Sequence, residues 1–174
     1  MSGLIGKMVV AAALAALTVT SASAACWNPV SVSAAKVRDF EAMLRGASLR
    51  CTKDVPELKI AYSKFVTASR PAFAEANKTI RAHFAEDSGL VGSFSAYNGF
   101  LTTITNSYGS GTSGLSCADF GDFVNAANAE GASPDVLTRL ADMAGASPTL
   151  VGQRCSNRVT TAKPVGLQQV AVNK

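Results

Sequence analysis

The sequence predicts an all-α protein, a compact bundle of about five to six antiparallel helices stapled by two disulfides. Segments between residues 31 and 143 repeat apolar side chains at the i, i+3, i+4, i+7 spacing of amphipathic helices, and short turns separate them. Four cysteines, an even number, all lie beyond residue 25. In an oxidising compartment they predict two disulfides.

The first 24 residues have the three-part design of a secretory signal peptide. Lys7 precedes an unbroken apolar run over residues 8–17, and the small residues Ala22, Ser23 and Ala24 offer a cleavage site. The run is about half of the ~20 residues that a membrane-spanning helix needs. We therefore expect a Sec-type signal peptide over 1–24, a helical domain over 25–155 and a flexible tail over 156–174. The cleaved protein should be soluble, and periplasmic or secreted.

The first helix lies between Cys26 and Cys51 and should start near Ser31 or Ser33, either of which can cap its free amides. One face is apolar, which predicts that it is buried: Val37, Phe40, Met43, Leu44 and Ala47. The other face is polar, and we expect it in solvent: Lys36, Arg38, Asp39, Glu41 and Arg45.

The second helix should begin at Asp54, because Glu57 stands three residues later as in a capping box. Pro71 should end it and open a third helix, which runs to a turn at residues 86–89. A fourth helix covers about residues 90–108. Its second half is rich in β-branched residues, but no partner strand is visible, so a helix is the better interpretation.

The last two helices follow a Gly/Ser-rich loop at residues 109–114. One should run from Cys117 to Gly131. Ser133 then caps, and Pro134 opens, a final helix that fades at Gly145.

The helices also constrain the disulfides. A helix over residues 33–50 is about 27 Å long, whereas bridged Cα atoms lie roughly 4.4–6.8 Å apart. If this helix is continuous, Cys26 cannot pair with Cys51. If the helices alternate in direction, the fourth ends where the first begins, which puts Cys117 beside Cys26. We predict Cys26–Cys117 and Cys51–Cys155. The swapped pairing, Cys26–Cys155 with Cys51–Cys117, remains open.

Two catalytic-looking motifs are better explained by structure. Residues 109–114 spell GxGxxG, but a dinucleotide site needs that turn between a buried strand and a helix. Ser33 and Lys36 match SxxK without its SDN and KTG companions. We interpret the first as a flexible loop, and the second as a capping serine with a surface lysine.

His83 is the only histidine, and a serine or cysteine hydrolase would need it as the base. Its position at a helix border favours a surface or hydrogen-bonded residue. Neighbouring carboxylates, such as Asp39 and Glu41, point apart on a helix and make no acid–base pair. With one histidine and no CxxC pair we expect no metal, and we expect no cofactor.

The sequence Ser23-Ala24-Ala25-Cys26 resembles a lipoprotein cleavage box, but lipidation of Cys26 would leave three cysteines. Basic and acidic residues are interspersed rather than clustered, so we expect a solvated, mildly basic face and no nucleic-acid partner.

The arrangement of Cys26-Trp27, Leu49-Arg50-Cys51, Tyr97, Asn106-Ser107-Tyr108-Gly109, Cys117 and Cys155 resembles small exported four-cysteine helical proteins of bacteria, of unknown function. Some of these carry an automatic label of S-adenosyl-L-homocysteine hydrolase. That enzyme is larger, cytosolic and NAD-binding, and nothing in this sequence supports the label.

The sequence therefore favours an exported, non-enzymatic binding or envelope-interaction module with a protein or small-molecule partner. A small periplasmic hydrolase and an outer-membrane lipoprotein anchored at Cys26 are the alternatives.

Overall fold

A computed structural model describes residues 25–112 and 114–155. The predicted signal peptide and the C-terminal tail lie outside the described residues. Within them the protein is all-helical: α1 (Pro29–Arg50), α2 (Leu58–Ala68), α3 (Arg70–Ser107), α4 (Cys117–Glu130) and α5 (Pro134–Met143). The predicted fold class, all-α with two disulfides, is confirmed.

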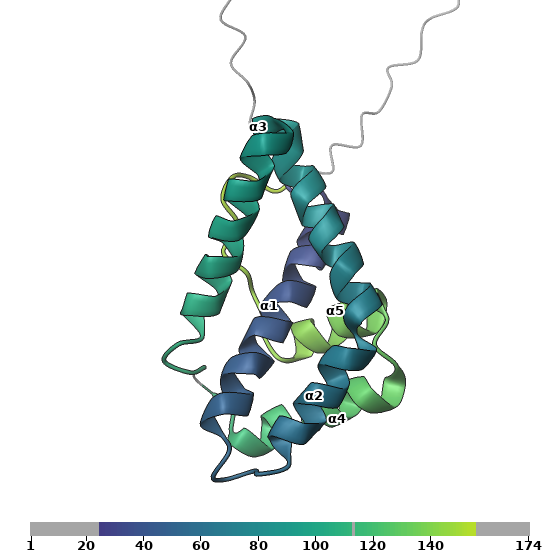
Figure 1. Ribbon diagram of the computed structural model, residues 1–174, viewed down its shortest axis with the longest axis vertical. Coiled ribbons are helices and arrows are strands. Elements are labelled where there is room, and N and C mark those ends of the chain that lie inside the picture. Colours follow the sequence, from purple (N-terminus) through teal and green to yellow (C-terminus); the bar gives the residue numbers. More distant parts are fainter. Residues whose placement is uncertain (1–24, 113, 156–174) are drawn as a thin grey trace, which may run out of the picture.

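Helix α1 is the central element of the molecule. Asn28, rather than Ser31 or Ser33, caps it by accepting a hydrogen bond from the Ser31 amide, and Pro29 occupies the first turn. The helix packs most extensively against α3 and α5 (Figure 1). Because neighbours surround it, both of its faces are covered, and Asp39 and Glu41 are 1% and 3% exposed. The prediction that its polar face lies in solvent is wrong for these two residues.

Helix α2 starts later than its sequence predicts. Asp54 and Glu57 form no capping box, and turns carry the chain from Cys51 to Leu58. The predicted boundary between the second and third helices is confirmed. Helix α2 ends at Ala68 and α3 begins at Arg70, with Pro71 in its first turn. The two helices follow one another in the same general direction rather than folding back (Figure 1).

Helix α3 consists of two arms joined at a kink. Gly89 has φ 68° and ψ 176°, a conformation open in practice only to glycine, so the helical path turns sharply there. The expected turn at residues 86–89 is therefore present as a kink inside one continuous element. The arms, residues 70–88 and 90–107, diverge from this apex as an inverted V that straddles α1 (Figure 1).

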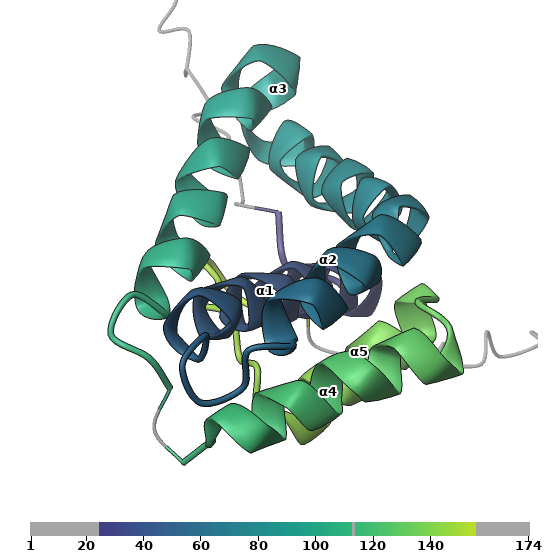
Figure 2. The same ribbon diagram turned by 60° about the horizontal axis from the view of Figure 1, so that its bottom comes forward.

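Helices α4 and α5 lie side by side across α1 from the two arms (Figure 2). Both begin where the sequence predicts, at Cys117 and Pro134. Ser116 and Asp119 form a capping box on α4, and the Ser133 side chain accepts from the Val136 amide on α5. The core between the elements is apolar, and its largest fully buried side chains include Trp27, Phe40, Phe65, Met43 and Leu44.

The disulfides join Cys26 to Cys155 and Cys51 to Cys117, with Cα–Cα distances of 4.9 and 5.5 Å. Our preferred pairing is wrong, and the swapped pairing is the correct one. The error comes from counting α2 as a reversal of direction. Since α2 and the first arm of α3 run the same way, the second arm ends beside the end of α1 rather than beside its start. The Arg50 guanidinium accordingly donates to the Tyr108 carbonyl, 2.6 Å away.

Candidate functional site

The strongest candidate site is a cavity of about 380 Å³ in the angle between the two arms of α3. The first arm contributes His83, Phe84, Asp87 and Ser88. The second arm contributes Ala96, Gly99, Phe100 and Thr103, which follow the i, i+3, i+4, i+7 spacing of one helix face. Because the kink at Gly89 spreads the arms, both faces can look into one space.

The third wall of the cavity is made by non-helical chain, including Ala25 and residues 149, 151 and 152. Trp27 fixes this wall. Its amide donates to the Gln153 carbonyl and its carbonyl accepts from the Cys155 amide, both at 2.9 Å, and its indole nitrogen donates to the Val151 carbonyl at 2.8 Å. The Cys26–Cys155 disulfide joins the same two segments of the chain. These hydrogen bonds and the disulfide therefore fix the position of the wall, although it is not helical.

His83 is the buried polar side chain in the lining of the cavity. The side chain is only 5% exposed, and its Nδ1 atom is buried with no hydrogen-bond partner. Burial lowers the pKa of His83 below its ordinary value of 6.5, against the opposing pull of the Glu86 and Asp87 carboxylates. Near pH 7 the imidazole is therefore neutral, with one nitrogen that donates and one that accepts. The prediction of a surface or hydrogen-bonded His83 is wrong.

Aromatic rings back the imidazole. The Trp27 ring lies 3.8 Å from that of His83, centroid to centroid, and meets Phe84 edge-on at 5.6 Å. Phe100 lies 6.0 Å from Trp27 and 6.2 Å from Phe84. The distances to Phe84 and Phe100 are typical of packed aromatic pairs, and the Trp27–His83 distance is shorter. The result is a mostly apolar cavity with an imidazole in its lining, which is the usual composition of a small-molecule site.

Ser88 and Asp87 line the same cavity as His83, so the three residue types of a hydrolase meet there. They do not form a catalytic chain. The Ser88 hydroxyl donates to the Phe84 carbonyl at 2.8 Å, within its own helix. Among the described residues no hydrogen bond links His83 to either neighbour. The imidazole is therefore not positioned to take a proton from Ser88.

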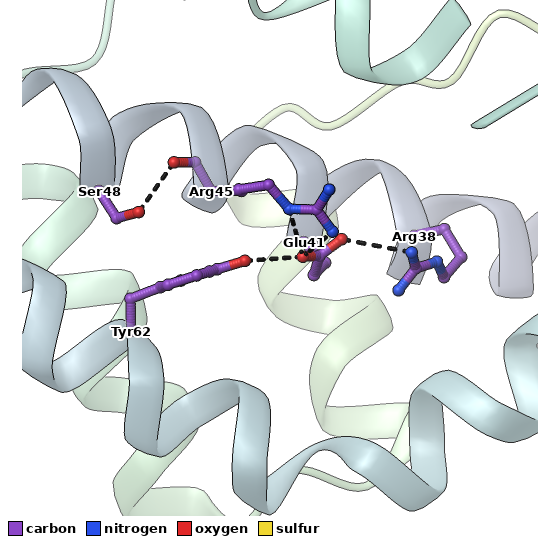
Figure 3. Close-up of polar contacts among 5 residues, drawn as sticks. All are labelled: Arg38, Glu41, Arg45, Ser48 and Tyr62. Carbon is purple, nitrogen blue, oxygen red and sulfur yellow. Dashed lines mark hydrogen bonds and ion pairs between the residues drawn. The ribbon is translucent and has the colours of Figure 1, made fainter. Parts of the chain in front are cut away.

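A second polar cluster, absent from the predicted sites, surrounds Glu41 (Figure 3). Its Oε1 accepts from the Tyr62 hydroxyl at 2.7 Å and from two nitrogens of Arg45 at 2.6 and 3.0 Å. Its Oε2 pairs with Arg38 at 3.4 Å. The cluster ties α1 to α2 through the hydrogen bond from Tyr62. It is not fully satisfied, because Arg38 Nε and Glu41 Oε2 are buried without a hydrogen-bond partner.

Asp39 occupies the opposite side of α1 and is also buried. The Tyr108 hydroxyl donates to it at 2.8 Å. Burial raises the pKa of Asp39 to about 6, although the hydrogen bonds from Tyr108 and from the Ser147 backbone oppose that shift.

The predicted motifs do not converge on a site. Gly109, Gly111 and Gly114 belong to the connection between α3 and α4, and no parallel sheet flanks them in the described residues. Lys36 makes an ion pair with Asp142, so its ammonium is engaged rather than free to activate Ser33.

All four cysteines are in disulfides, as predicted, and Cys26 is bonded to Cys155. A thioether-linked lipid would need the same Cys26 sulfur, so the anchor and this disulfide are alternatives.

Within residues 25–112 and 114–155, no group of three or more His, Cys, Asp or Glu side chains is placed to hold a metal ion. Over the same ranges, none of the helices is both long and apolar enough to cross a membrane.

Comparison with known proteins adds no relative. No protein-family model matches the chain, and neither curated proteins nor solved structures give a significant match.

Proposed function

We propose that this is an exported, disulfide-stabilised binding protein that holds a small, mostly apolar molecule in the cavity between the arms of α3. The observation that carries the proposal is the mostly apolar cavity itself, which has the imidazole of His83 in its lining. No hydrogen bond of the described residues occupies the buried Nδ1 of that ring. A ligand in the cavity can therefore combine apolar contacts with a hydrogen bond to the imidazole.

The chemistry of the lining indicates the ligand class. Aromatic and small side chains suit a flat, apolar body such as a substituted benzene ring. Neutral His83 can accept a hydrogen bond from a hydroxyl group or donate one to an oxygen. A phenol combines both features, so p-cresol is a suitable probe, and toluene is its matched counterpart without the hydroxyl group.

Trp27 supplies the measurement, because it is the only tryptophan and it lies against His83. We expect p-cresol to change the emission of Trp27, which is excited at a wavelength where phenols absorb little. The protein should bind p-cresol with an affinity about tenfold higher than its affinity for toluene. His83→Phe keeps a ring but removes both nitrogens. It should lose the preference for p-cresol, retain binding of toluene, and unfold at a higher temperature because no buried nitrogen remains unpaired.

Gly99→Leu tests the cavity itself. Nothing lies within 4 Å of where a Gly99 side chain would start, so leucine can extend into the cavity and fill it. Thr102→Leu is the matched control, because it places the same side chain on the exposed face of the same helix. Binding should disappear in the first variant and survive in the second. Equal affinities in both would remove this cavity as the site.

A small hydrolase is the second candidate, favoured by the presence of His83, Asp87 and Ser88 in one lining. The hydrogen bond of Ser88 to its own helix weighs against it. Turnover of an activated ester that disappears in both His83→Gln and Ser88→Ala would favour the hydrolase over the binding protein.

Export to the periplasm or the exterior belongs to the same proposal. The two disulfides fit an oxidising compartment. The kinship with small exported four-cysteine proteins stays a prediction.

A further inference from the structure

The Glu41 cluster holds more positive charge than its carboxylate balances. Glu41 Oε1 accepts from both Arg45 and Tyr62, whereas Arg38 approaches only Oε2, at 3.4 Å, and that oxygen makes no hydrogen bond. Arg38 lies at the far end of the cluster from Tyr62 (Figure 3). Its side chain is 12% exposed. Arg38 is therefore held beside Glu41 by charge, and its hydrogen-bonding capacity is left over.

Arg81 brings a second guanidinium from the first arm of α3. Its Nε donates to the Asn77 carbonyl one turn earlier, at 3.4 Å, so the side chain bends back along the arm. The guanidinium carbon lies 5.8 Å from the centre of the Phe94 ring and 5.9 Å from that of Tyr97. Within the described residues no ion pair involves Arg81. Its position is therefore fixed by aromatic rings, while its charge has no paired carboxylate.

The two guanidiniums approach the same region between the arms. The Arg38 guanidinium carbon lies 5.3 Å from the centre of the Phe73 ring, and Phe73 is about two turns before Arg81, toward which the Arg81 side chain bends. Burial raises the pKa of Tyr97, the charges of Arg38 and Arg81 oppose that shift, and Glu41 adds to it. Both cations therefore lie within electrostatic range of the Tyr97 hydroxyl.

The other carboxylates of α3 are engaged elsewhere. Glu75 lines a separate hollow beside the starts of α1 and α5, and it pairs with Lys78 at 3.8 Å. Asp87 lines the His83 cavity, and the charges of Glu86 and Asp87 both act on the imidazole. None of these three acids is among the charges that shift Tyr97. A net positive charge therefore remains between the arms.

We propose that Arg38, Arg81 and Tyr97 bind a small oxyanion with two negative charges, the chemistry of a phosphate or sulfate group. Guanidinium groups present paired N–H donors that match the oxygens of such a group. The Tyr97 hydroxyl supplies a further donor, because, unlike those of Tyr62 and Tyr108, it donates to no carboxylate in the described residues. None of the three lines the His83 cavity, so this site is separate from the apolar one.

The test is a calorimetric titration of the oxidised protein with inorganic phosphate at pH 7.5 and low ionic strength. We expect one saturable site, with at least about tenfold weaker binding of acetate, which has one negative charge. Methyl phosphate is titrated separately, because it distinguishes the phosphate of an ester from the free anion as the natural source.

Variants identify the binding residues. Arg38→Gln and Arg81→Gln should each lower the affinity for phosphate at least about tenfold, and Tyr97→Phe about fivefold. Arg81→Lys keeps the charge but loses the planar pair of donors, so its loss should be smaller than that of Arg81→Gln. Arg139→Gln is the matched control, because it removes the same charge from α5, across α1 from the arms (Figure 2). The emission of buried Trp27 verifies that each variant is folded.

Three results would overturn the proposal. The first is the absence of saturable phosphate binding at low ionic strength. The second is an unchanged affinity in folded Arg81→Gln and Tyr97→Phe, since neither residue makes an ion pair in the described part of the chain. The third is a loss in Arg139→Gln as large as in Arg81→Gln, which would mean that phosphate responds only to the net charge of the protein.

Discussion

At the scale of single residues, Asp39 links stability to pH. Burial raises the pKa of its carboxyl to about 6, above the ordinary 3.8, so the folded protein favours the protonated form. The resulting stabilisation is fully present below about pH 3.8 and is lost as the pH rises through about 6. Two pKa units correspond to about 2–3 kcal/mol at most.

Asp39→Asn imitates the protonated carboxyl and should remove this dependence. Urea unfolding at pH 4.5 and pH 7.5 provides the measurement. We expect the variant to gain most over the parent at pH 7.5 and least at pH 4.5. His83 contributes with the opposite sign, because burial lowers its pKa and acid therefore destabilises the fold through it. For this reason only the difference between variant and parent is informative. Asp122→Asn, at an exposed position on α4, is the control, and its stability should differ little from that of the parent at either pH.

The buried polar residues were the hardest to predict from sequence. The period of α1 separates its apolar stripe from its polar one, and Phe40 and Leu44 are buried as expected. The same period cannot reveal which distant elements cover the polar residues. Tyr62 of α2, which is 21 residues away, donates to Glu41, and Tyr108 donates to Asp39. A polar stripe on a helix therefore predicts solvent only when no further element packs there.

At the scale of elements, the kink of α3 determines where the cavity and the apex lie. Gly89 has a positive φ, and nothing lies within 4 Å of where its side chain would be, so any cost of substitution is conformational. Gly89→Ala should destabilise the protein by about 1–3 kcal/mol. The matched control is a substitution at Gly99, where a side chain would also meet nothing within 4 Å but the backbone is helical.

Gly99→Ala should be neutral or stabilise the protein by up to about 1 kcal/mol, because alanine favours the helix. Thermal unfolding of the two variants gives the comparison. Equal and small effects would mean that the kink does not depend on glycine at position 89.

Element boundaries were predictable where local chemistry decides them. The Ser133 cap and Pro134 placed the start of α5 correctly. The predicted start of α4 at Cys117 is also confirmed, and Ser116 is the residue that caps it. Asp54 and Glu57 match the same kind of pattern, yet they lie in turns. There the Cys51–Cys117 disulfide and the packing of α2 on α4 position the chain, and a four-residue pattern contains no information about either.

At the scale of the whole molecule, the two disulfides have different tasks. Cys51–Cys117 joins the end of α1 to the start of α4, whereas Cys26–Cys155 holds the cavity wall against Trp27. Each closes a long loop, with sequence separations of 66 and 129 residues, so removing either should cost roughly 2–5 kcal/mol.

The variants should differ in ligand binding. Cys26→Ser with Cys155→Ser releases the wall that includes Val151, so we expect the affinity for p-cresol to fall at least tenfold. Cys51→Ser with Cys117→Ser lies away from the cavity lining and should leave affinity close to that of the parent at a temperature where both remain folded. Titrations monitored by Trp27 emission check this, and an equal loss in the two variants would contradict the separate roles.

Global topology is what the sequence left undecided. Composition and periodicity identified an all-helical fold with two disulfides, and geometry excluded Cys26–Cys51. The choice between the remaining pairings depended on whether the chain reverses at Ser69, which a one-residue connection does not reveal. The cavity could not be predicted for a similar reason. Its walls come from residues 83–103, from Ala25 before α1, and from residues 149–152 after α5.

The Cys26–Cys155 bridge has a consequence for how the chain could be rearranged. Its Cα atoms are 4.9 Å apart, so the two boundaries of the described domain are neighbours. A short linker between those boundaries, with new termini opened in the loop between α3 and α4, would give a circular permutant with the same helix contacts. The domain could likewise be inserted into a surface loop of a host protein, entering and leaving at nearly the same point.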